Sequence, residues 1–363
     1  MHGRIGLVGA LAVALLVGCG DSGDGRTDSG GMDAGSTPTG PVVFRSCDPV
    51  MVDAGPPPDL GAPPMCFGTP SMDCATRPVA TCTMGLGCVV TQAEAKVRAL
   101  GQALLDSGLS RDRPLAILSA GSIAHALMAL AASHVGIPYC PVSPAYSLVA
   151  TGFEKLAHVI DVVSPGMVFV ENYNDFAPAL ARISQNGHSV VANFAAPMDV
   201  LSLAELAETT PTSRVDDAHR AIAPDDTRSI LFTSGTTGRP KGVITTHRMT
   251  TVNQQMFLQT FPEFGQTPPV ILSWLPWHHT SGANSILGSV LYNLGTLWID
   301  SGKPIDGPPM QETIRNLQDV APTAYFTAPS GFRLLAKALR DDDGLRRLMA
   351  ARTRESAGNS LPS

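Results

Sequence analysis

The sequence predicts an α/β protein in which mainly parallel sheets are flanked by helices, preceded by a segment without a fold of its own. Three observations favour this class. From Thr91 onward, short apolar runs alternate with segments whose apolar residues recur at helical spacing. Strands that alternate with helices form parallel sheets with helices on both faces. The composition also changes abruptly at Glu94, because no lysine or glutamate precedes it.

The bulk properties limit the partners of the chain. Its 363 residues are enough for about two domains and a substantial core. A net charge of −6 and a pI near 5.8 argue against nucleic acid as an electrostatic partner. Basic residues are not clustered, so a polybasic membrane patch is not expected either.

Residues 1–19 predict an export signal. Arg4 supplies a positive charge, and Ile5–Val17 is an apolar run that is too short to span a bilayer comfortably. The run ends in Leu-Val-Gly-Cys at Cys19, which resembles the lipobox of bacterial lipoproteins, where the cysteine thiol is acylated. Cys19 is therefore the candidate lipidation site, and membrane lipid is an expected partner. The alternative is an ordinary short leader in which the cysteine has no role.

Residues 20–90 are expected to form a low-complexity tether, which leaves 91–363 as the globular part. The tether is rich in glycine, serine and aspartate, and its proline runs favour an extended conformation. Its cysteines could form disulfides in an exported chain, with one thiol left over and the pairing undetermined. A zinc site is disfavoured, because there is no Cys-x-x-Cys pair and no neighbouring histidine. These cysteines are Cys47, Cys66, Cys74, Cys82 and Cys88.

The globular part begins with four helix–strand alternations. The first helical pattern ends at Gly108, a typical C-cap, and the apolar strand runs are of the kind buried in parallel sheets. Cys140 lies in one of these runs, where a buried inert thiol is favoured over a reactive one. The expected helices are 94–109, 123–136, 155–165 and 175–185, and the expected strands are 114–120, 137–144, 167–170 and 189–193.

A loop crowded with glycines and hydroxyls follows the next expected strand, 229–233, and precedes another at 242–247. Its sequence after Phe232 is TSGTTGRPKG. The glycines allow positive φ and a close approach of the backbone, and successive exposed N–H groups form an anion-binding concavity. Hydroxyl groups add further donors, and Lys241 adds a compact charge suited to phosphate. The loop is therefore predicted to bind a polyphosphate.

Two common nucleotide motifs do not fit this loop. A Walker A loop needs Gly-Lys-Ser/Thr, whereas Lys241 follows Pro240 and precedes Gly242; the dinucleotide pattern G-x-G-x-x-G is absent as well. The segment 233–242 resembles the phosphate-binding loop of the adenylate-forming (AMP-binding) enzymes at every position of Thr-Ser-Gly-Thr-Thr-Gly-x-Pro-Lys-Gly. The alternative is a surface hairpin rich in turn-forming residues.

Other segments extend the resemblance. Residues 275–285 are similar to the Leu-Pro-x-x-His-x-x-Gly segment of the family, which aligns His279 with the family histidine and Gly282 with its glycine. The alignment is ambiguous by one position, so His278 is its neighbour or its substitute, and a pair of histidines closing a strand is the alternative. Residues 321–335 resemble the strand and helix ahead of the adenine site. Residues 121–148 resemble the branch of acyl- and aryl-CoA synthetases that includes feruloyl-CoA synthase.

The resemblance implies an ATP-dependent acid–thiol ligase, a type of acyl-CoA ligase. In this family a carboxylic acid attacks the α-phosphate of ATP, and a thiol, usually that of coenzyme A, then displaces AMP. The implied cofactors and co-substrates are ATP, Mg2+ and coenzyme A. The candidate catalytic residues are Lys241 and His279. The resemblance places His279 near the reacting carboxylate. The candidate phosphate-binding residues are Thr233, Ser234, Gly235, Thr236, Thr237, Gly238 and Lys241.

The family pattern is incomplete in this chain. The aromatic-Gly-x-Thr-Glu segment, the Thr-Gly-Asp segment and the small domain with its catalytic lysine are not found. Residues 91–363 are thus expected to be a partial large N-terminal domain, truncated and impaired in catalysis. The alternative is a non-catalytic, membrane-tethered lipoprotein module that binds nucleotide. The last residues resemble the start of the adenine loop, where the candidate contacts are Gly358, Asn359 and Ser360.

The two parts of the chain imply different compartments. The leader predicts a membrane-anchored lipoprotein, whereas adenylation consumes cytoplasmic ATP. A gene fusion or mis-assembled reading frame, a membrane-displayed pseudoenzyme and a cytoplasmic enzyme with a misleading leader remain as explanations. The acid itself is not readable from the sequence: Trp274, Trp277 and Phe332 could line an aromatic-acid pocket, but core packing explains large aromatic residues more often.

Overall fold

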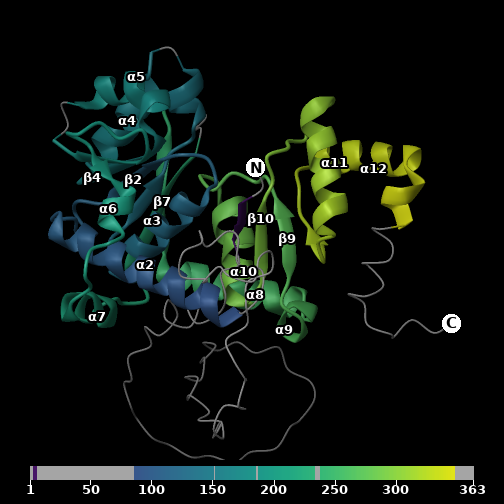
Figure 1. Cartoon of the computed structure of the whole chain (residues 1–363), viewed down its shortest axis with the longest axis horizontal. Coiled ribbons are helices and arrows are strands. Elements are labelled where there is room, and N and C mark those ends of the chain that lie inside the picture. The colour runs from purple at the N-terminus through teal and green to yellow at the C-terminus, as the bar shows by residue number, and fades with distance from the viewer. Residues whose placement is uncertain (1–2, 6–85, 151, 185–186, 234–237, 348–363) are drawn as a thin grey trace, which may run out of the picture.

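The computed structural model contains two sheets that share a layer of helices (Figure 1). It describes residues 3–5, 86–150, 152–184, 187–233 and 238–347. The larger sheet has seven strands and the smaller sheet has four. The predicted fold class, mainly parallel sheet flanked by helices, is confirmed for the part of the chain after residue 86.

The large sheet is parallel except at one edge, where β8 runs antiparallel to β7. Strand β2 lies in its interior. The next strand in the chain, β3, lies on one side of β2, and the following strand, β4, lies on the other side, so the strand order reverses at β2. In open α/β sheets, the carboxyl ends of the strands at such a point border the ligand crevice. In sheet order the strands are β6 (Leu201–Ser202), β5 (Ser189–Phe194), β4 (Met167–Asn172), β2 (Leu115–Leu118), β3 (Tyr139–Pro141), β7 (Thr227–Thr233) and β8 (Lys241–Thr246).

Helices cover both faces of the large sheet, as the continuous apolar strands require. Leu115 and Ile117 of β2 pack with α2 (Leu86–Asp106) and α3 (Ile123–His134). Ala116 and Leu118 point to the opposite face, where α4 (Glu154–Val163) and α5 (Tyr173–Ile183) cover them. The period of two along each strand therefore separates two cores, one on each side of the sheet.

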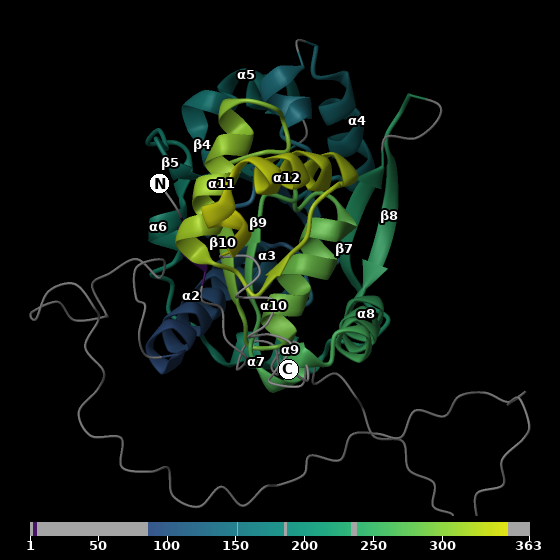
Figure 2. The ribbon, with the colours of Figure 1, turned by 90° about the vertical axis from the view of Figure 1, so that its right-hand side faces the viewer.

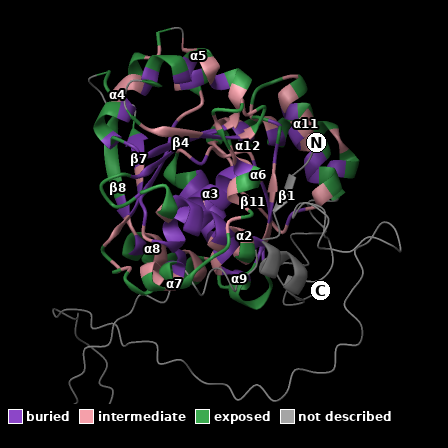
Figure 3. Ribbon diagram, turned by 60° about the vertical axis from the view of Figure 1, so that its left-hand side comes forward, coloured by how far each residue is buried: buried purple, intermediate pink, exposed green. Residues whose placement is uncertain are grey.

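Helix α3 is buried nearly all round, because it lies between the two sheets (Figure 3). Its first residue follows the N-cap Ser122, whose hydroxyl accepts a hydrogen bond from the backbone N–H of His125. The core cluster that contains α3 also holds Ile271, Ile286 and Leu297 of the smaller sheet and its helices. A helix that is apolar on every face is typical of such a central position.

The smaller sheet is formed mainly by strands from the second half of the chain. Its strands β10, β9 and β11 are parallel, and β1 pairs antiparallel with β10. Helices α11 and α12 cover its outer face through Leu317 and Leu335, which pack on Leu272, and Figure 2 shows these helices in front of β9. The strands are β1 (Gly3–Ile5), β10 (Thr296–Ile299), β9 (Val270–Ser273) and β11 (Ala324–Tyr325), and the helices are α11 (Pro308–Val320) and α12 (Pro329–Asp341).

The remaining elements are helices that connect these layers. Two of them, η3 and η5, are π-helical, a geometry that is rare and often found at functional sites. They are η3 (Ala145–Val149), α6 (Leu203–Leu206), α7 (Ser213–Arg220), α8 (His247–Thr260), α9 (Glu263–Gln266), η5 (Ser281–Leu287) and α10 (Gly288–Tyr292).

Within the N-terminal part the structure describes two stretches: Gly3–Ile5 of the expected leader, which forms β1 and pairs with β10, and the end of the expected tether. Helix α2 begins at Leu86, before the compositional boundary at Thr91, because the apolar residues after Gly85 extend the first helical pattern. Cys88 therefore lies on a helix. The lipidation candidate Cys19 and the other tether cysteines lie outside the described residues. No helix in the described ranges is long and apolar enough to cross a membrane.

Candidate functional site

The glycine-rich loop joins the two antiparallel strands β7 and β8 at the edge of the large sheet (Figure 2). Thr233 pairs with Lys241 as the last register pair before the loop, and the Thr233 hydroxyl donates to the Lys241 carbonyl at 3.5 Å. Directly paired residues of antiparallel strands place their side chains on the same face. Thr233 and Lys241 therefore present their side chains on the same face of the hairpin, and both residues are exposed.

The base of the loop is fixed on the side of Lys241. Pro240 is buried, and its carbonyl oxygen accepts a hydrogen bond from Nε2 of His158 on α4 at 3.0 Å. Gly242 packs so closely on β7 that a Cβ there would lie 3.1 Å from Ile230. Gly238 has a φ of 84°, the left-handed conformation expected of a glycine in this loop. The candidates Ser234, Gly235, Thr236 and Thr237 lie outside the described residues.

The loop leaves the large sheet at its carboxyl edge. Strand β7 is parallel to β3, which is parallel to β2, so Thr233 ends on the same edge as Leu118. The sheet order reverses at β2, and ligands of open α/β sheets bind along the carboxyl edge at such a reversal. The position of Thr233 and Lys241 therefore agrees with the phosphate-binding role predicted from the sequence.

A second group of candidate residues follows β9 in a tight turn. Trp277 is buried at the centre of this turn, and its ring packs edge-on against His125 of α3 at a centroid distance of 5.1 Å. Gly121 admits this packing, because a Cβ at Gly121 would lie 3.2 Å from the indole. Trp277 therefore joins the turn to the central helix, and its role is core packing.

His278 and His279 lie next to one another after Trp277, with ring centroids 4.5 Å apart. His279 is exposed, whereas His278 is half-buried. Burial, together with the charge of His279, lowers the pKa of His278 to about 4, so His278 is neutral at pH 7. A neutral imidazole offers one donor and one acceptor to a polar group. The two histidines are thus distinct in exposure, although the sequence alone does not separate them.

Gly282 sets the shape of the turn. It is buried, and a Cβ at this position would lie 2.4 Å from the Pro276 carbonyl oxygen and 2.7 Å from that of Leu275. Contacts this short with backbone atoms exclude a side chain. The Gly282 backbone therefore closes directly onto the segment that leads to His278 and His279, and hydrogen bonding from the Ala283 N–H to the His279 carbonyl at 3.0 Å continues the turn into η5.

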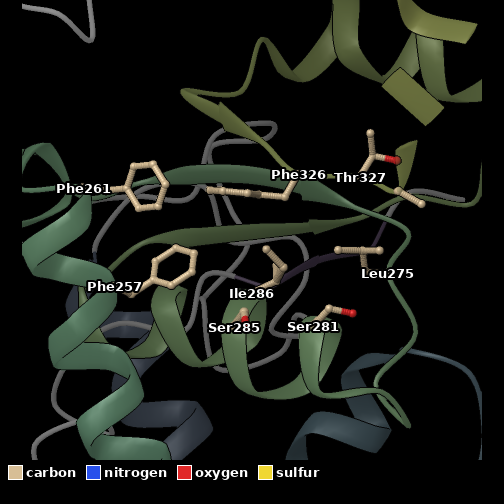
Figure 4. Close-up of a pocket in the computed structure, with 9 residues that line it drawn as sticks. Phe257, Phe261, Leu275, Ser281, Ser285, Ile286, Phe326 and Thr327 are labelled. Atoms are coloured by element: carbon tan, nitrogen blue, oxygen red, sulfur yellow. The ribbon is translucent and has the colours of Figure 1, made fainter. Parts of the chain in front are cut away.

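A pocket of about 420 Å³ opens beside this turn (Figure 4). Its walls come from the end of α8, the turn after β9, the helix η5 and the segment after β11. The phenylalanines, Phe257, Phe261 and Phe326, gather at one end, and Ser281 and Thr327 lie toward the other. The lining is completed by Leu275, Ser285, Ile286 and Ala328.

The aromatic residues that could have lined a pocket do not line this one. Trp277 is in the core, and Phe332 lies on α12 with half of its surface exposed. Trp274 is not a lining residue either, but its indole N–H donates a hydrogen bond to the hydroxyl of the lining residue Thr327 at 3.0 Å. Phe257 and Phe261 could not be singled out from the sequence, because the apolar residues of α8 and its C-cap have the spacing of an ordinary amphipathic helix.

The structure thus describes two candidate groups, the end of the β7–β8 hairpin and the histidine turn with its pocket. Among the described hydrogen bonds, none joins one group to the other. The adenine candidates Gly358, Asn359 and Ser360 lie outside the described residues. His125 is a residue that sequence reasoning missed: it is buried, its Nδ1 lies 2.9 Å from the Ser119 hydroxyl, and burial lowers its pKa to about 4.

The described residues contain no cluster of three or more His, Cys, Asp or Glu side chains that could hold a metal ion. Mg2+ is usually bound through one or two carboxylates together with the phosphates of a nucleotide. By this chemistry Mg2+ would enter the site as part of the MgATP substrate.

Comparison with known proteins identifies relatives for most of the chain. A family model described as "AMP-binding enzyme" matches residues 88–363. The putative fatty-acid–CoA ligase fadD21 of Mycobacterium leprae is 29% identical over 241 residues, which cover 65% of this chain and 39% of that protein. The 4-coumarate–CoA ligase 1 of Arabidopsis thaliana is 39% identical over 94 residues, which cover 25% of this chain and 17% of that protein.

Solved structures show the same arrangement of sheets. Apo MatB from Rhodopseudomonas palustris superposes with a TM-score of 0.55 and 21% identity, covering 72% of this chain and 47% of that one. The anthranilate CoA ligase AuaEII in complex with anthranoyl-AMP superposes with a TM-score of 0.53 and 13% identity, covering 67% and 44%. At these identities the likeness establishes the fold alone. In each of these four comparisons the aligned part spans less than half the length of the relative.

Proposed function

The chain belongs to the AMP-binding enzyme family, and from this premise we propose that it activates a carboxylic acid with ATP to form an acyl-adenylate. Its α/β fold, with a mainly parallel sheet flanked by helices, corresponds to the N-terminal domain of adenylate-forming enzymes. We further propose that a thiol, that of coenzyme A, displaces AMP in a second step. Both steps are proposals for the whole protein, since the aligned part covers less than half of its relatives.

One observation carries the first step: the β7–β8 hairpin pairs Thr233 directly with Lys241 at the carboxyl edge of the sheet, and both residues are exposed. Lys241 is exposed, and its charge is free to approach a phosphate without a desolvation cost from burial. The buried Pro240 and the close packing of Gly242 hold the backbone that carries it. A pre-positioned cation of this kind stabilises the charge that develops on the leaving pyrophosphate.

In the proposed reaction a carboxylate oxygen attacks the α-phosphorus of ATP. A bond forms between that oxygen and phosphorus, and the bond from phosphorus to the bridging oxygen of the β-phosphate breaks, so pyrophosphate leaves with the electron pair. Lys241 and Thr233 would contact the departing phosphates. His278 is neutral at pH 7, because burial lowers its pKa to about 4, and as a neutral donor it can orient a carboxylate without forming a fixed ion pair. Catalysis then depends mainly on position and charge.

The test is acid-dependent exchange of labelled pyrophosphate into ATP by the full chain. We expect exchange with at least one acid from a panel of aliphatic and aromatic monocarboxylic acids, and no exchange without acid. Lys241→Ala is expected to lower the rate by about 10- to 100-fold, the loss typical of one hydrogen bond to a charged group. Arg239→Ala removes an exposed cation from the same loop and serves as the matched control.

Failure of exchange has two distinct meanings. If no acid supports exchange but ATP still binds and Lys241→Ala weakens that binding, the chain is a non-catalytic nucleotide-binding module. If ATP does not bind, or binds equally well when Lys241 and Thr236 are both replaced by alanine, the proposed phosphate site is wrong.

The finer assignment to an aryl- or feruloyl-CoA synthase-like branch is also a proposal. It rests on residues 121–148, which form α3, β3 and η3. The described pocket is lined by other segments, and α3 is buried between the sheets. Residues 121–148 therefore determine the packing of the core and not the choice of acid. The relatives that match include a fatty-acid–CoA ligase and a 4-coumarate–CoA ligase, which supports acyl and aryl acids equally.

We also propose that the leader directs the chain to the membrane, with Cys19 as the lipidated residue. The motif that ends in Cys19 supports this placement. Labelling of cells with a palmitate analogue is expected to mark the wild-type chain and not Cys19→Ala, with Cys47→Ala as the control. Absence of label, together with recovery of the chain in the cytoplasmic fraction, would instead identify the leader as a fusion without function.

A further inference from the structure

We infer that the pocket beside the histidine turn selects monocarboxylic acids whose body is apolar and uncharged, and rejects acids that carry a second charge. This inference rests on the proposed function, since it assigns the acid-binding site of that reaction. It divides carboxylic acids into two groups: fatty and aryl monocarboxylic acids are accepted, and acids with a second carboxylate or an ammonium at the far end of the body are excluded.

The first argument is the aromatic end of the pocket. Phe257 packs on Phe261 at a centroid distance of 5.1 Å and on Phe326 at 5.7 Å, and Phe261 meets Phe326 edge-on at 5.9 Å. The three rings therefore form one wall whose members hold each other in place. Such a wall favours an apolar body, either aliphatic or aromatic, through burial of its surface and ring contacts.

The second argument is charge. None of the described residues that line the pocket carries a charged side chain. A second carboxylate or an ammonium at the aromatic end would lose its hydration without gaining a partner, which costs several kcal/mol for an unpaired ion in an apolar site. The pocket therefore discriminates against acids with a second charge because its described lining offers no counter-ion, and not only because of its shape.

The third argument is the polarity gradient along the pocket (Figure 4). Ser281 and Thr327 lie at the end away from Phe257 and Phe261, and Ser281 follows His279 closely along the chain. The Thr327 hydroxyl accepts a hydrogen bond from the Trp274 indole N–H and also hydrogen-bonds the side chain of Tyr325. The acid's reacting carboxylate is thus expected at the hydroxyl end, near the histidines, with its body extending to the phenyl rings.

The pocket is also larger than the smallest acids need. Its volume of about 420 Å³ lies within the range of ~300–1,000 Å³ that is typical of small-molecule sites. An acetate group would leave the aromatic end uncovered. Each methylene that reaches this end adds up to about fourfold in affinity, the factor expected for a fully buried methylene.

The first test compares matched acids for binding to the full chain without ATP, followed by Trp fluorescence or calorimetry. The probes are octanoate against octanedioate and octanoate against 8-aminooctanoate, whose second charge lies at the end of the molecule far from the reacting carboxylate. We expect octanoate to bind at least about 30-fold more tightly than either charged partner, the factor for a few kcal/mol of uncompensated charge. Equal binding within either pair overturns the inference.

The second test supplies the missing counter-ion. Phe257→Lys places an ammonium at the aromatic end on the helix α8, and octanedioate is then expected to bind more tightly than octanoate. Met256→Lys is the matched control: it adds the same charge one residue away on the same helix, at a position that is 58% exposed and outside the pocket lining. The control is expected to keep the wild-type preference.

A second variant is included in case Phe257→Lys does not fold. Ser285→Lys introduces the charge from η5 instead of α8. Reversal of the preference in either folded variant supports the inference, and an unchanged preference in both contradicts it. Thermal melting of each variant identifies those that are folded.

Binding and catalysis separate this inference from the proposed function. If monocarboxylic acids bind with the expected preference but none supports pyrophosphate exchange, the pocket assignment stands and the adenylation proposal fails. If exchange occurs equally with octanoate and octanedioate, the adenylation proposal stands and the pocket inference fails.

Discussion

Gly282 is the residue on which the shape of the histidine turn depends most directly. Any side chain there would meet the carbonyl oxygens of Leu275 and Pro276, which are backbone atoms and cannot move without shifting the turn. The sequence identified Gly282 only through its resemblance to a family motif. The structure supplies the physical reason, which is a close approach of two backbone segments.

We predict that Gly282→Ala lowers the free energy of unfolding by about 1–3 kcal/mol, the usual cost of overpacking a buried site. Acid-dependent exchange should fall as well, because the turn carries His278 and His279. Gly152→Ala is the control: its new methyl would meet only the flexible end of the Glu154 side chain. Chemical denaturation measures both variants, and equal stability of the two would contradict the assigned role of Gly282.

His125 makes the stability of the protein depend on pH. Burial lowers its pKa to about 4 in the folded chain, compared with about 6.5 when unfolded. Below pH 6.5 the unfolded state binds a proton that the folded state refuses, so stability falls as the pH falls toward 4. Above pH 6.5 this effect leaves the free energy of unfolding unchanged. At pH 5 it lowers the free energy of unfolding by about 2 kcal/mol.

The corresponding prediction compares unfolding by urea at pH 7.5 and pH 5 for wild type and His125→Asn. The variant is expected to be less stable at pH 7.5 but to lose less stability on acidification, by about 2 kcal/mol. An identical pH dependence of the two proteins would show that His125 is not held neutral by burial.

At the scale of elements, the two strands of the β7–β8 hairpin could be predicted from the sequence. The hairpin is encoded by local residues: apolar strand runs at Ser229–Thr233 and Gly242–His247 flank a segment of glycines and one proline. Helices α3, α4 and α5 and their strands were predicted for the same reason, since each is a continuous periodic pattern.

Elements that depend on distant partners were not predictable. The pocket is formed by α8, η5 and the segment after β11, which are brought together only by the smaller sheet. The π-helical geometry of η5 has no local signature in the residues Ser281–Leu287. Phe257 and Phe326 are far apart in the sequence, so their contact follows from the fold and not from a motif.

Helix α7 provides a prediction at this scale, since polar contacts attach it to α2. Gln102 is buried and accepts hydrogen bonds from the backbone N–H and the hydroxyl of Thr212, at 3.0 Å and 2.7 Å, at the start of α7. Gln102→Ala leaves that N–H without its partner and should cost about 1–3 kcal/mol. Arg214→Ala, which removes an exposed ion pair with Asp106, should cost less than about 1 kcal/mol.

Hydrogen exchange within 213–220 is the measurement that checks this prediction. Amides of α7 are expected to exchange faster in Gln102→Ala, because the helix has lost its attachment at its first turn. Arg214→Ala should leave their exchange close to that of wild type. Similar exchange in both variants would mean that α7 is held by its other contacts, namely its apolar ones and the ion pair between Arg98 and Asp216.

For the whole molecule, the central helix α3 joins both sheets into one core. The cluster around α3 contains residues of the large sheet and of the smaller one, and Trp277 extends the contact to the histidine turn. A shared core of this kind favours cooperative unfolding of the described part of the chain. The two candidate groups are therefore expected to be gained and lost together.

Cooperativity can be measured because the three tryptophans, Trp274, Trp277 and Trp298, all belong to the second half of the chain. Unfolding followed by tryptophan fluorescence reports on the smaller sheet, whereas far-ultraviolet circular dichroism reports on every helix. We predict coincident urea transitions by the two probes. Two separated midpoints would show that the sheets unfold independently and that α3 does not couple them.

The phosphate-binding role of the β7–β8 loop is tested most directly by measuring the Kd values of ATP and AMP for wild type and Lys241→Ala. Because Lys241 is assigned to the β- and γ-phosphates, its removal should weaken ATP binding by about 10- to 100-fold, the loss of one charge-assisted hydrogen bond, and leave AMP binding nearly unchanged. An equal loss for both nucleotides, or no loss for either, would contradict the role assigned to this loop.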